Sequence, residues 1–171
     1  MRVAVTGTPG TGKTTATDLV ETDLPVVHLN EAIREEDLDE GLDEDRDSRV
    51  ADLDAVRAYL ADHEDLLVES HLAHLVDVDR VVVLRCHPER IERRLRERDE
   101  PEETVRENAE SEAVDVILAE AVERHGRDAV YEIDTTDRSP EEVAREIEAV
   151  VVGDRDPSAG EVSFLDYLDE P

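Results

Sequence analysis

The feature that most constrains this chain is a glycine-rich loop that lies between an apolar run and a helical pattern. Residues 3–6 read as a short buried strand, which is followed directly by Gly7-Thr8-Pro9-Gly10-Thr11-Gly12-Lys13-Thr14-Thr15. The spacing Gly-x-x-x-x-Gly-Lys-Thr fits the Walker A pattern, and the strand before it and the helix after it supply the context that this pattern needs. The start of the chain therefore predicts a phosphate-binding loop in an α/β fold.

The residue types of this loop suit phosphate chemistry. Its glycines allow tight turns that bring backbone N–H groups close to phosphate oxygens, and the following helix adds the positive end of its dipole. Lys13 offers a point charge to the β and γ phosphates, the Thr14 hydroxyl can ligate Mg²⁺, and Thr15 can reach the α-phosphate. We therefore expect the phosphates of ATP to be bound by Gly10, Gly12, Lys13, Thr14 and Thr15.

Lysine occurs once in the chain, and that one lysine lies in this loop. The 19 basic residues are 18 arginines and Lys13, against 48 carboxylates, so the formal net charge is −29. Such a surface suggests adaptation to a salt-rich cytosol, because a screening length of about 3 Å at molar salt makes the repulsion tolerable. Lys13 is retained where an ammonium group suits a phosphate pair better than a planar guanidinium does.

The same composition excludes several classes of protein. A Ras-like GTPase reads guanine with an Asn/Thr-Lys-x-Asp motif, which would need a second lysine. Strong binding of nucleic acid is not expected, because the net charge repels phosphates. Cys86 is the one cysteine, so an internal disulfide and a multi-cysteine zinc site are excluded. No apolar run approaches the roughly 20 residues of a membrane span and no signal-peptide pattern is present, so we expect a cytoplasmic protein.

Five short segments that read as strands alternate with helical patterns along the chain. We expect strands at 3–6, 24–29, 66–68, 81–84 and 129–133, and helices at 13–20, 31–34, 50–63, 88–98, 101–126 and 140–151. This alternation predicts one domain, residues 1–152, with a parallel sheet covered by helices on both faces. Residues 35–49 are very acidic and are expected to form an exposed, mobile loop. Residues 153–171 are expected to be a loosely held acidic tail. Its apolar residues, Phe164-Leu165 and Tyr167-Leu168, are expected to pack back on the core, with a docking motif for a partner as the alternative.

Further segments follow the loop in a specific order: Ala32-Ile33-Arg34-Glu35-Glu36, Asp39-Glu40-Gly41-Leu42-Asp43-Glu44, Val68-Glu69-Ser70-His71, Val83-Leu84-Arg85, Arg94-Leu95-Arg96-Glu97-Arg98 and Glu107-Asn108-x-x-x-Glu112. Together with the loop, over about residues 2–150, they resemble the small adenylate kinase-like NTPases that assist maturation of the small ribosomal subunit. This family, of adenylate kinase isoenzyme 6 type, includes the nuclear adenylate kinase isoenzyme that interacts with coilin and its archaeal counterparts.

The resemblance implies a P-loop NTPase fold with strand order 2-3-1-4-5, a monophosphate-binding flap at about residues 28–51 and a short lid at about residues 97–107. It also implies the reaction ATP + AMP to 2 ADP with Mg²⁺, a further ATPase activity, and a role in 16S rRNA maturation. The partner implied for that role is a basic platform protein of the small ribosomal subunit.

The resemblance also assigns site residues. Arg98 matches the nucleotide-contacting arginine of the lid, Arg34 the arginine that holds the acceptor phosphate, and Arg138 a basic contact near the adenine. Glu69-Ser70-His71 matches an Asp-x-His motif, in which the acid lies near Mg²⁺ and the histidine is linked to ATP hydrolysis. Glu69 is one methylene longer than Asp, so its contact with the metal is expected to pass through water.

Plainer interpretations of these residues stay open. Six arginines lie between Arg85 and Arg98, and some of them can simply pair with neighbouring glutamates on a solvated helix. His71 can be an ordinary histidine that satisfies a backbone carbonyl, and His74 has no match that favours a functional role. Three functions are compatible with the sequence: a kinase of AMP, an ATPase-driven ribosome assembly factor with little kinase flux, and a P-loop kinase of another metabolite such as shikimate, gluconate or dephospho-coenzyme A.

Overall fold

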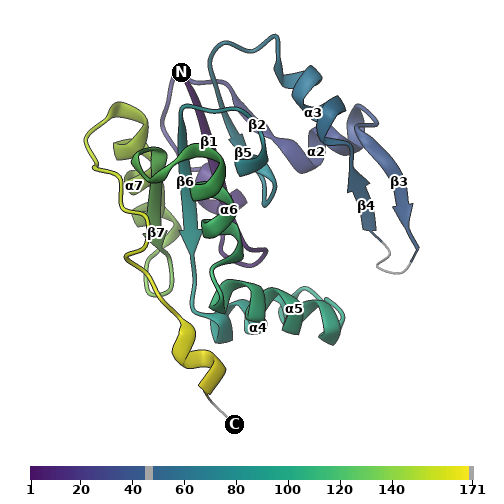
Figure 1. Ribbon diagram of the computed structural model, residues 1–171, viewed down its shortest axis with the longest axis vertical. Coiled ribbons are helices and arrows are strands. Elements are labelled where there is room, and N and C mark those ends of the chain that lie inside the picture. The colour runs from purple at the N-terminus through teal and green to yellow at the C-terminus, as the bar shows by residue number, and fades with distance from the viewer. Residues whose placement is uncertain (45–47, 170–171) are drawn as a thin grey trace.

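The computed structural model describes residues 1–44 and 48–169, and a five-stranded parallel sheet forms its centre (Figure 1). The strands are β1 (Arg2–Gly7), β2 (Val26–His28), β5 (Leu66–Glu69), β6 (Arg80–Arg85) and β7 (Val130–Asp134). Their order in the sheet is β2-β5-β1-β6-β7. Counted along the chain within this sheet, that order is 2-3-1-4-5, so the predicted fold class is confirmed.

The central strands are buried on both faces, as their unbroken apolar runs predict. Side chains of β1, β5 and β6 alternate between two separate clusters of buried residues because successive residues of a strand point to opposite faces. The pairing of β1 with β6 sets Val5 opposite Val82, and the pairing of β1 with β5 sets Ala4 opposite Val68.

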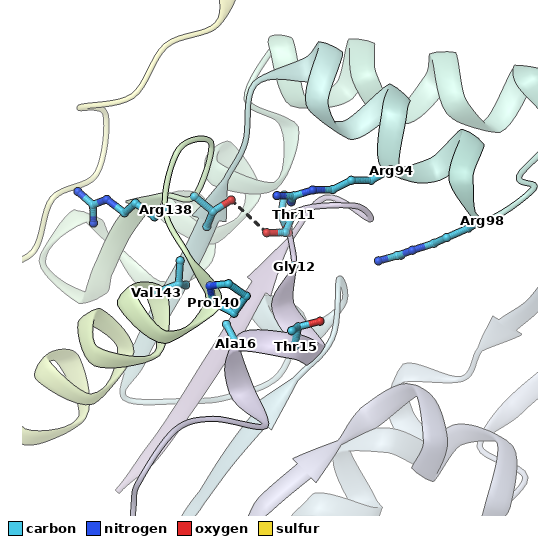
Figure 2. A pocket seen from close by; sticks show the side chains of 10 residues that line it. Thr11, Gly12, Thr15, Ala16, Arg94, Arg98, Arg138, Pro140 and Val143 are labelled. Carbon is cyan, nitrogen blue, oxygen red and sulfur yellow. Dashed lines mark hydrogen bonds between the residues drawn. The ribbon is translucent and has the colours of Figure 1, made fainter.

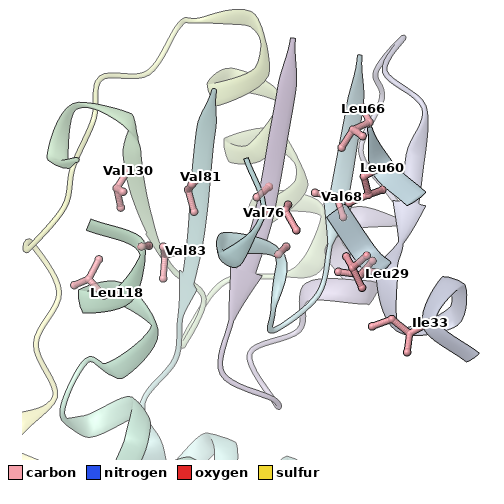
Figure 3. Close-up of a cluster of buried hydrophobic side chains, with 14 residues drawn as sticks. Leu29, Ile33, Leu60, Leu66, Val68, Val76, Val81, Val83, Leu118 and Val130 are labelled. Carbon is pink, nitrogen blue, oxygen red and sulfur yellow. The ribbon is translucent and has the colours of Figure 1, made fainter. Parts of the chain in front are cut away.

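Helices cover both faces of the sheet. On one face α1 (Lys13–Thr17) and α7 (Pro140–Val152) pack against β1, β5, β6 and β7, with Ile147 fully buried. On the other face α2 (Leu29–Glu35), α3 (Leu53–Leu60) and α6 (Val116–His125) bury Leu29, Leu60 and Leu118 against the sheet (Figure 3). Short 3₁₀ turns lie at Ala73–Leu75, Arg127–Ala129 and Leu165–Asp169.

Two further helices, α4 (Pro88–Glu97) and α5 (Glu102–Ala113), lie beyond the carboxyl end of β6 (Figure 1). They pack on each other around a small cluster of Cys86, Ile91, Leu95 and Val105. The segment expected to be the lid, residues 97–107, comprises the end of α4, a turn at Asp99 and the first half of α5. None of the helices among residues 1–44 and 48–169 is long and apolar enough to cross a membrane.

The acidic segment expected to be a loop contains a hairpin. Strands β3 (Asp39–Asp43) and β4 (Ser48–Ala51) pair antiparallel outside the main sheet, and part of the segment, residues 45–47, lies outside the described residues. The expected exposure is confirmed for most of its residues, but the expectation of a loop throughout was wrong. An ion pair across the hairpin, 2.8 Å between Arg49 and Asp39, and backbone pairing stabilise strands that bury almost nothing. An apolar pattern therefore could not have indicated them.

The long helix expected at residues 101–126 is two helices. The break lies at Val114 and Asp115, where Asp115 adopts a left-handed backbone conformation with φ of 57°. Its carboxylate forms an ion pair with the guanidinium of Arg85, a residue of β6. The break contains no glycine or proline that would have indicated it. It depends on the contact of Asp115 with Arg85, which lies 30 positions earlier in the sequence.

The C-terminal segment is held more firmly than a loose tail. The Ser158 backbone N–H donates to the Val130 carbonyl at 3.0 Å, and Phe164, only 7% exposed, packs over the Arg85 guanidinium. The Tyr167 hydroxyl donates to Glu92 of α4 at 2.6 Å. For residues 153–169 the expectation of a loosely held tail was therefore wrong, while the expectation that Phe164 packs back on the core is confirmed. Residues 170–171 lie outside the described part of the chain.

Candidate active site

The glycine-rich loop joins β1, the middle strand of the sheet, to α1 at the carboxyl edge of the sheet. Gly7 lies so close to β6 that a Cβ atom there would approach the Leu84 carbonyl oxygen to 2.6 Å. Gly12, with φ of 89°, holds the left-handed conformation just before α1 begins. Both positions require glycine, so the loop has the backbone that its motif predicts.

Lys13 is folded back over the loop. Its side chain is buried, and Nζ donates to the Thr8 carbonyl oxygen at 3.2 Å. Burial lowers the pKa of Lys13 to about 8, with the carboxylate of Glu69 acting against this shift. Near neutral pH the side chain is therefore a cation that donates to a backbone carbonyl of its own loop.

Two cavities meet above the loop. The first, called the α7 cavity here, has a volume of about 220 Å³ and is lined by Thr11, Gly12, Thr15, Ala16, Arg94, Arg98, Thr135, Arg138, Pro140 and Val143 (Figure 2). The second, the β5 cavity, has a volume of about 230 Å³ and is lined by Pro9, Gly10, Gly12, Lys13, Thr14, Thr15, Asn30, Glu69, His71 and Arg98. Gly12, Thr15 and Arg98 line both cavities, so the two cavities adjoin at the loop.

Two arginines of α4 reach this site. Arg94 donates to the Gly10 carbonyl oxygen at 2.9 Å and so binds α4 to the loop. Arg98, one turn later, is exposed and lines both cavities, with its side chain directed toward the loop (Figure 2). These two of the six arginines between 85 and 98 provide positive charge at the loop.

Other arginines of that group have different partners. Arg85 is 1% exposed and is surrounded by the carboxylates of Glu112, Asp115 and Glu132. Arg90 pairs with Asp137, and Arg96 pairs with Glu92 and Glu102. The plainer interpretation, in which some of these arginines pair with neighbouring acids, is therefore correct for Arg96.

Thr14 and Glu69 lie side by side in the β5 cavity. The Thr14 hydroxyl donates to Glu69 Oε1 at 3.2 Å, and Glu69 itself is 5% exposed. A hydroxyl and a carboxylate are hard oxygen donors of the kind that Mg²⁺ prefers, and this ion commonly keeps several of its waters. The donor set therefore fits a magnesium ion that arrives with a nucleotide.

His28 holds the other oxygen of this carboxylate, a role that the sequence did not reveal. Its Nδ1 lies 2.9 Å from Glu69 Oε2, and its Nε2 lies 3.0 Å from Asp18 Oδ1. Burial opposes protonation of the ring, but the hydrogen bond to Glu69 and the charges of both carboxylates outweigh it and raise the pKa of His28. The sequence offered one indication of this contact: His28 and Glu69 each lie at the end of a strand, and these two strands are neighbours in the sheet.

His71 and His74 occupy different environments. His71 lines the β5 cavity, where burial and the charge of Lys13 lower its pKa to about 4, so the ring is neutral near pH 7. His74 is buried below the loop, with Nδ1 at 2.9 Å from the Thr6 hydroxyl and Nε2 at 2.6 Å from Glu120. His74 is thus a structural histidine, while His71 borders the site.

Arg138 and Arg34 lie further from the loop than the other expected residues. Arg138 lines the α7 cavity with part of its side chain, but its guanidinium points away from Thr11 and lies 3.6 Å from Glu146 (Figure 2). Arg34 is exposed in the last turn of α2 and lines neither cavity. Asn30, one turn earlier in α2, does line the β5 cavity and accepts a hydrogen bond from Ser70 at 2.8 Å.

The chain is similar in sequence to a described protein family and to proteins of halophilic archaea. Residues 3–115 match a family described as an AAA domain. A protein of Natronomonas pharaonis is 65% identical over 98% of this chain and 100% of its own length, and one of Halobacterium salinarum is 60% identical over the same shares. Both are named "Putative adenylate kinase".

Among solved structures, the shikimate kinase of Acinetobacter baumannii in complex with shikimate has a similar fold. The two share 14% identity with a TM-score of 0.57, covering 90% of this chain and 94% of that one. At this identity the likeness concerns the fold alone. The motif, the loop geometry and the extensive identity agree: the chain belongs to the AAA domain family of P-loop proteins, together with these archaeal relatives.

Proposed function

We propose that this protein is a nucleoside monophosphate kinase that transfers the γ-phosphoryl group of ATP to AMP and yields two molecules of ADP. The observation that carries the proposal is that the α7 and β5 cavities adjoin at the loop, where Gly12, Thr15 and Arg98 line both of them. A nucleotide whose base occupies the α7 cavity would lay its phosphates along the loop and present the last one to the β5 cavity. The names of the two relatives support the same class of reaction.

Binding of the donor follows from the residues that line its cavity. Pro140 and Val143 offer apolar surface to a base, and the loop amides with the N-terminus of α1 face the phosphates. Lys13 would leave the Thr8 carbonyl oxygen for the β and γ phosphates. Arg98, which is exposed and lines both cavities, would close on the phosphoryl group in transfer, where charge spreads over the equatorial oxygens.

Magnesium would be held by the Thr14 hydroxyl and, through water, by Glu69, and it would neutralise charge on the β and γ phosphates. The side chains of the site would do the rest of the positioning and charge neutralisation. His71, neutral near pH 7, offers a hydrogen bond to the β5 cavity without adding charge. Transfer in this class of reaction depends mainly on positioning and charge neutralisation, which these residues provide.

The acceptor is assigned to the β5 cavity beside Asn30 and His71. Arg34, one turn further along α2, would reach the acceptor phosphate when the segment of residues 28–51 closes on it. Closure of this flap and of the lid at residues 97–107 would exclude water and protect ATP from hydrolysis. The cytoplasm, where ATP and AMP are available, is the compartment that we assign to this activity.

A second candidate function is an ATPase cycle that serves ribosome assembly. The net charge of −29 favours it, since a surface of this kind attracts a basic protein such as a platform protein of the small ribosomal subunit, whose role would be in 16S rRNA maturation. Salt weakens that attraction, because screening shortens its range. For this reason the kinase reaction remains the first proposal.

Incubation with ATP, Mg²⁺ and a panel of acceptors in concentrated KCl tests these functions. Stoichiometric formation of ADP from AMP supports the proposed kinase. Slow loss of ATP without any acceptor, accelerated by a basic ribosomal protein, supports the assembly function instead. Turnover of shikimate, gluconate or dephospho-coenzyme A, with none of the nucleoside monophosphates, would overturn both.

A further inference from the structure

We infer that His28 is a positioning residue for phosphoryl transfer: it fixes one oxygen of Glu69 so that the other stays directed at Thr14 and the β5 cavity. The inference rests on the proposed function for its relevance to catalysis. Its structural basis, however, is a set of contacts among four residues that lie around the end of two strands.

The sheet register places the two side chains together. His28 ends β2 and Glu69 ends β5, and their Cα atoms are direct partners in the parallel pairing of these strands. Both side chains therefore leave the sheet at the same carboxyl edge. His28 Nδ1 lies 2.9 Å from Glu69 Oε2 and Thr14 Oγ1 lies 3.2 Å from Glu69 Oε1, so among residues 1–44 and 48–169 each carboxylate oxygen has one hydrogen-bond partner.

The far side of the imidazole is fixed as well. His28 Nε2 lies 3.0 Å from Asp18 Oδ1, and the Asp18 backbone N–H donates to the Thr14 carbonyl oxygen at 3.0 Å. The contacts thus form a closed ring: Thr14 contacts Glu69, Glu69 contacts His28, His28 contacts Asp18, and the Asp18 backbone returns to Thr14 within α1. The orientation of the carboxylate is therefore set by the position of the helix that follows the phosphate-binding loop.

This arrangement suits the length of Glu69. A glutamate has one more rotatable bond than an aspartate, so ordering its carboxylate costs more conformational entropy unless a partner restrains it. An aspartate, shorter by one C–C bond of about 1.5 Å, could not keep both the Thr14 and the His28 contacts without movement of the backbone. His28 and Glu69 are thus a matched pair.

His28 acts through Glu69 and not on the nucleotide. It does not line the β5 cavity, whereas Glu69, Thr14 and Lys13 do. Partners behind a metal-facing carboxylate typically change metal affinity or activity by about 10–100-fold when they are removed. The inference therefore predicts a defect in the magnesium-dependent part of nucleotide binding, together with a defect in turnover.

The test compares His28→Leu with His28→Asn in concentrated KCl. The leucine removes both contacts, whereas the asparagine Nδ2 can replace the donor that faces Glu69 and gives up only the contact with Asp18. Calorimetry measures ATP affinity with EDTA and with Mg²⁺, and steady-state kinetics measures ADP formation from AMP. We expect His28→Leu to bind ATP in EDTA with the affinity of wild type. The factor by which Mg²⁺ raises ATP affinity should be about tenfold smaller in this variant, and kcat should fall about tenfold or more. His28→Asn should restore most of both losses.

Two outcomes would overturn the inference: an unchanged magnesium-dependent gain in His28→Leu, or equal defects in the leucine and asparagine variants. Combining His28→Leu with Glu69→Gln adds a further check, because His28→Leu should have no additional effect once the carboxylate is gone. Should His28→Leu not fold, His28→Ala takes its place in the same comparison. Failure of the proposed function would look different from failure of this inference, since wild-type protein would then bind ATP with Mg²⁺ but not convert AMP.

Discussion

The Thr8 hydroxyl donates to the carboxylate of Glu112 at 2.6 Å and so ties the phosphate-binding loop to α5. The second oxygen of Glu112 accepts from Arg85 Nε at 2.9 Å and from the Cys86 backbone N–H at 3.0 Å. Both Thr8 and Glu112 are buried. The helix that carries much of the expected lid is therefore anchored to the loop that it would cover and to the strand beside it.

Replacing Thr8 with valine should weaken this anchor while preserving the shape of the side chain. The variant leaves a buried carboxylate oxygen without its donor, so we expect a loss of about 1–3 kcal/mol in the free energy of unfolding and weaker ATP binding. Denaturant unfolding and calorimetry measure the two effects. Thr104→Val, on the same helix but away from the loop, is the matched control and should stay within about 0.5 kcal/mol of wild type. Equal stabilities of the two variants would contradict the role of the Thr8 contact.

Arg98 should contribute to turnover far more than an arginine elsewhere on these helices. Its side chain lines both cavities, so under the proposed function Arg98→Ala removes a cation from the transferring phosphoryl group and should lower kcat/KM about 100-fold or more. Arg106→Ala on α5 is the control, because Arg106 is exposed and pairs only weakly with Glu110 at 3.9 Å. Steady-state kinetics with ATP and AMP compares them. A kcat/KM for Arg98→Ala equal to that of the control would remove Arg98 from the mechanism.

His74 predicts a pH dependence of stability. Burial lowers its pKa below the ordinary value of 6.5, against the opposing effect of Glu120, so the folded protein binds this proton less readily than the unfolded chain. Stability contributed by the neutral ring is therefore present above about pH 6.5 and is lost as the pH falls below it. Relative to His74→Gln, wild type should lose stability on acidification, by up to about 1.4 kcal/mol per pH unit. Denaturant unfolding at several pH values measures this difference, and a difference that stays constant with pH would contradict the assignment.

The C-terminal segment should contribute to stability through Phe164. The ring is 7% exposed, lies 5.5 Å from the Arg85 guanidinium carbon and meets His87 edge-on with 5.4 Å between ring centroids. Phe164→Ala should cost about 3 kcal/mol in the free energy of unfolding, since it empties a filled site. Leu165 is 54% exposed, and Leu165→Ala should cost about 0.5 kcal/mol or less. If both variants had the same stability as wild type, the segment would be a loose tail after all.

The fold was predictable because its determinants are local in the sequence. The central strands β1, β5 and β6 contain unbroken apolar runs, and the glycine-rich loop identifies the junction of β1 and α1. What could not be predicted depends on partners that are distant in the sequence. Asp115 breaks a helical pattern because it meets Arg85, and the tail is held by groups of β7 and α4. The hairpin of β3 and β4 buries too little apolar surface to leave a pattern.

The site follows the same rule. Lys13, Thr14, Thr15 and Gly12 were identifiable because one contiguous motif contains them, and all four line the β5 cavity. The contribution of His28 depends on the register of β2 against β5, and that of Glu112 on how α5 packs against the loop. Neither the strand register nor the packing of α5 can be predicted from the spacing of residues in the sequence. Arg94 shares a helix face with Arg98, but only the structure shows that it binds the Gly10 carbonyl oxygen.

The most direct test of the central claim, that this loop and Lys13 hold the phosphates of a nucleoside triphosphate, is calorimetry of ATP with Mg²⁺ in concentrated KCl. It should be carried out below the Lys13 pKa of about 8, where the ammonium group is charged. We expect a clear heat of association for wild type and an affinity lower by about 100-fold for Lys13→Ala, with the thermal unfolding of the variant preserved. No heat of association for wild type, or equal affinities for both proteins, would contradict the account.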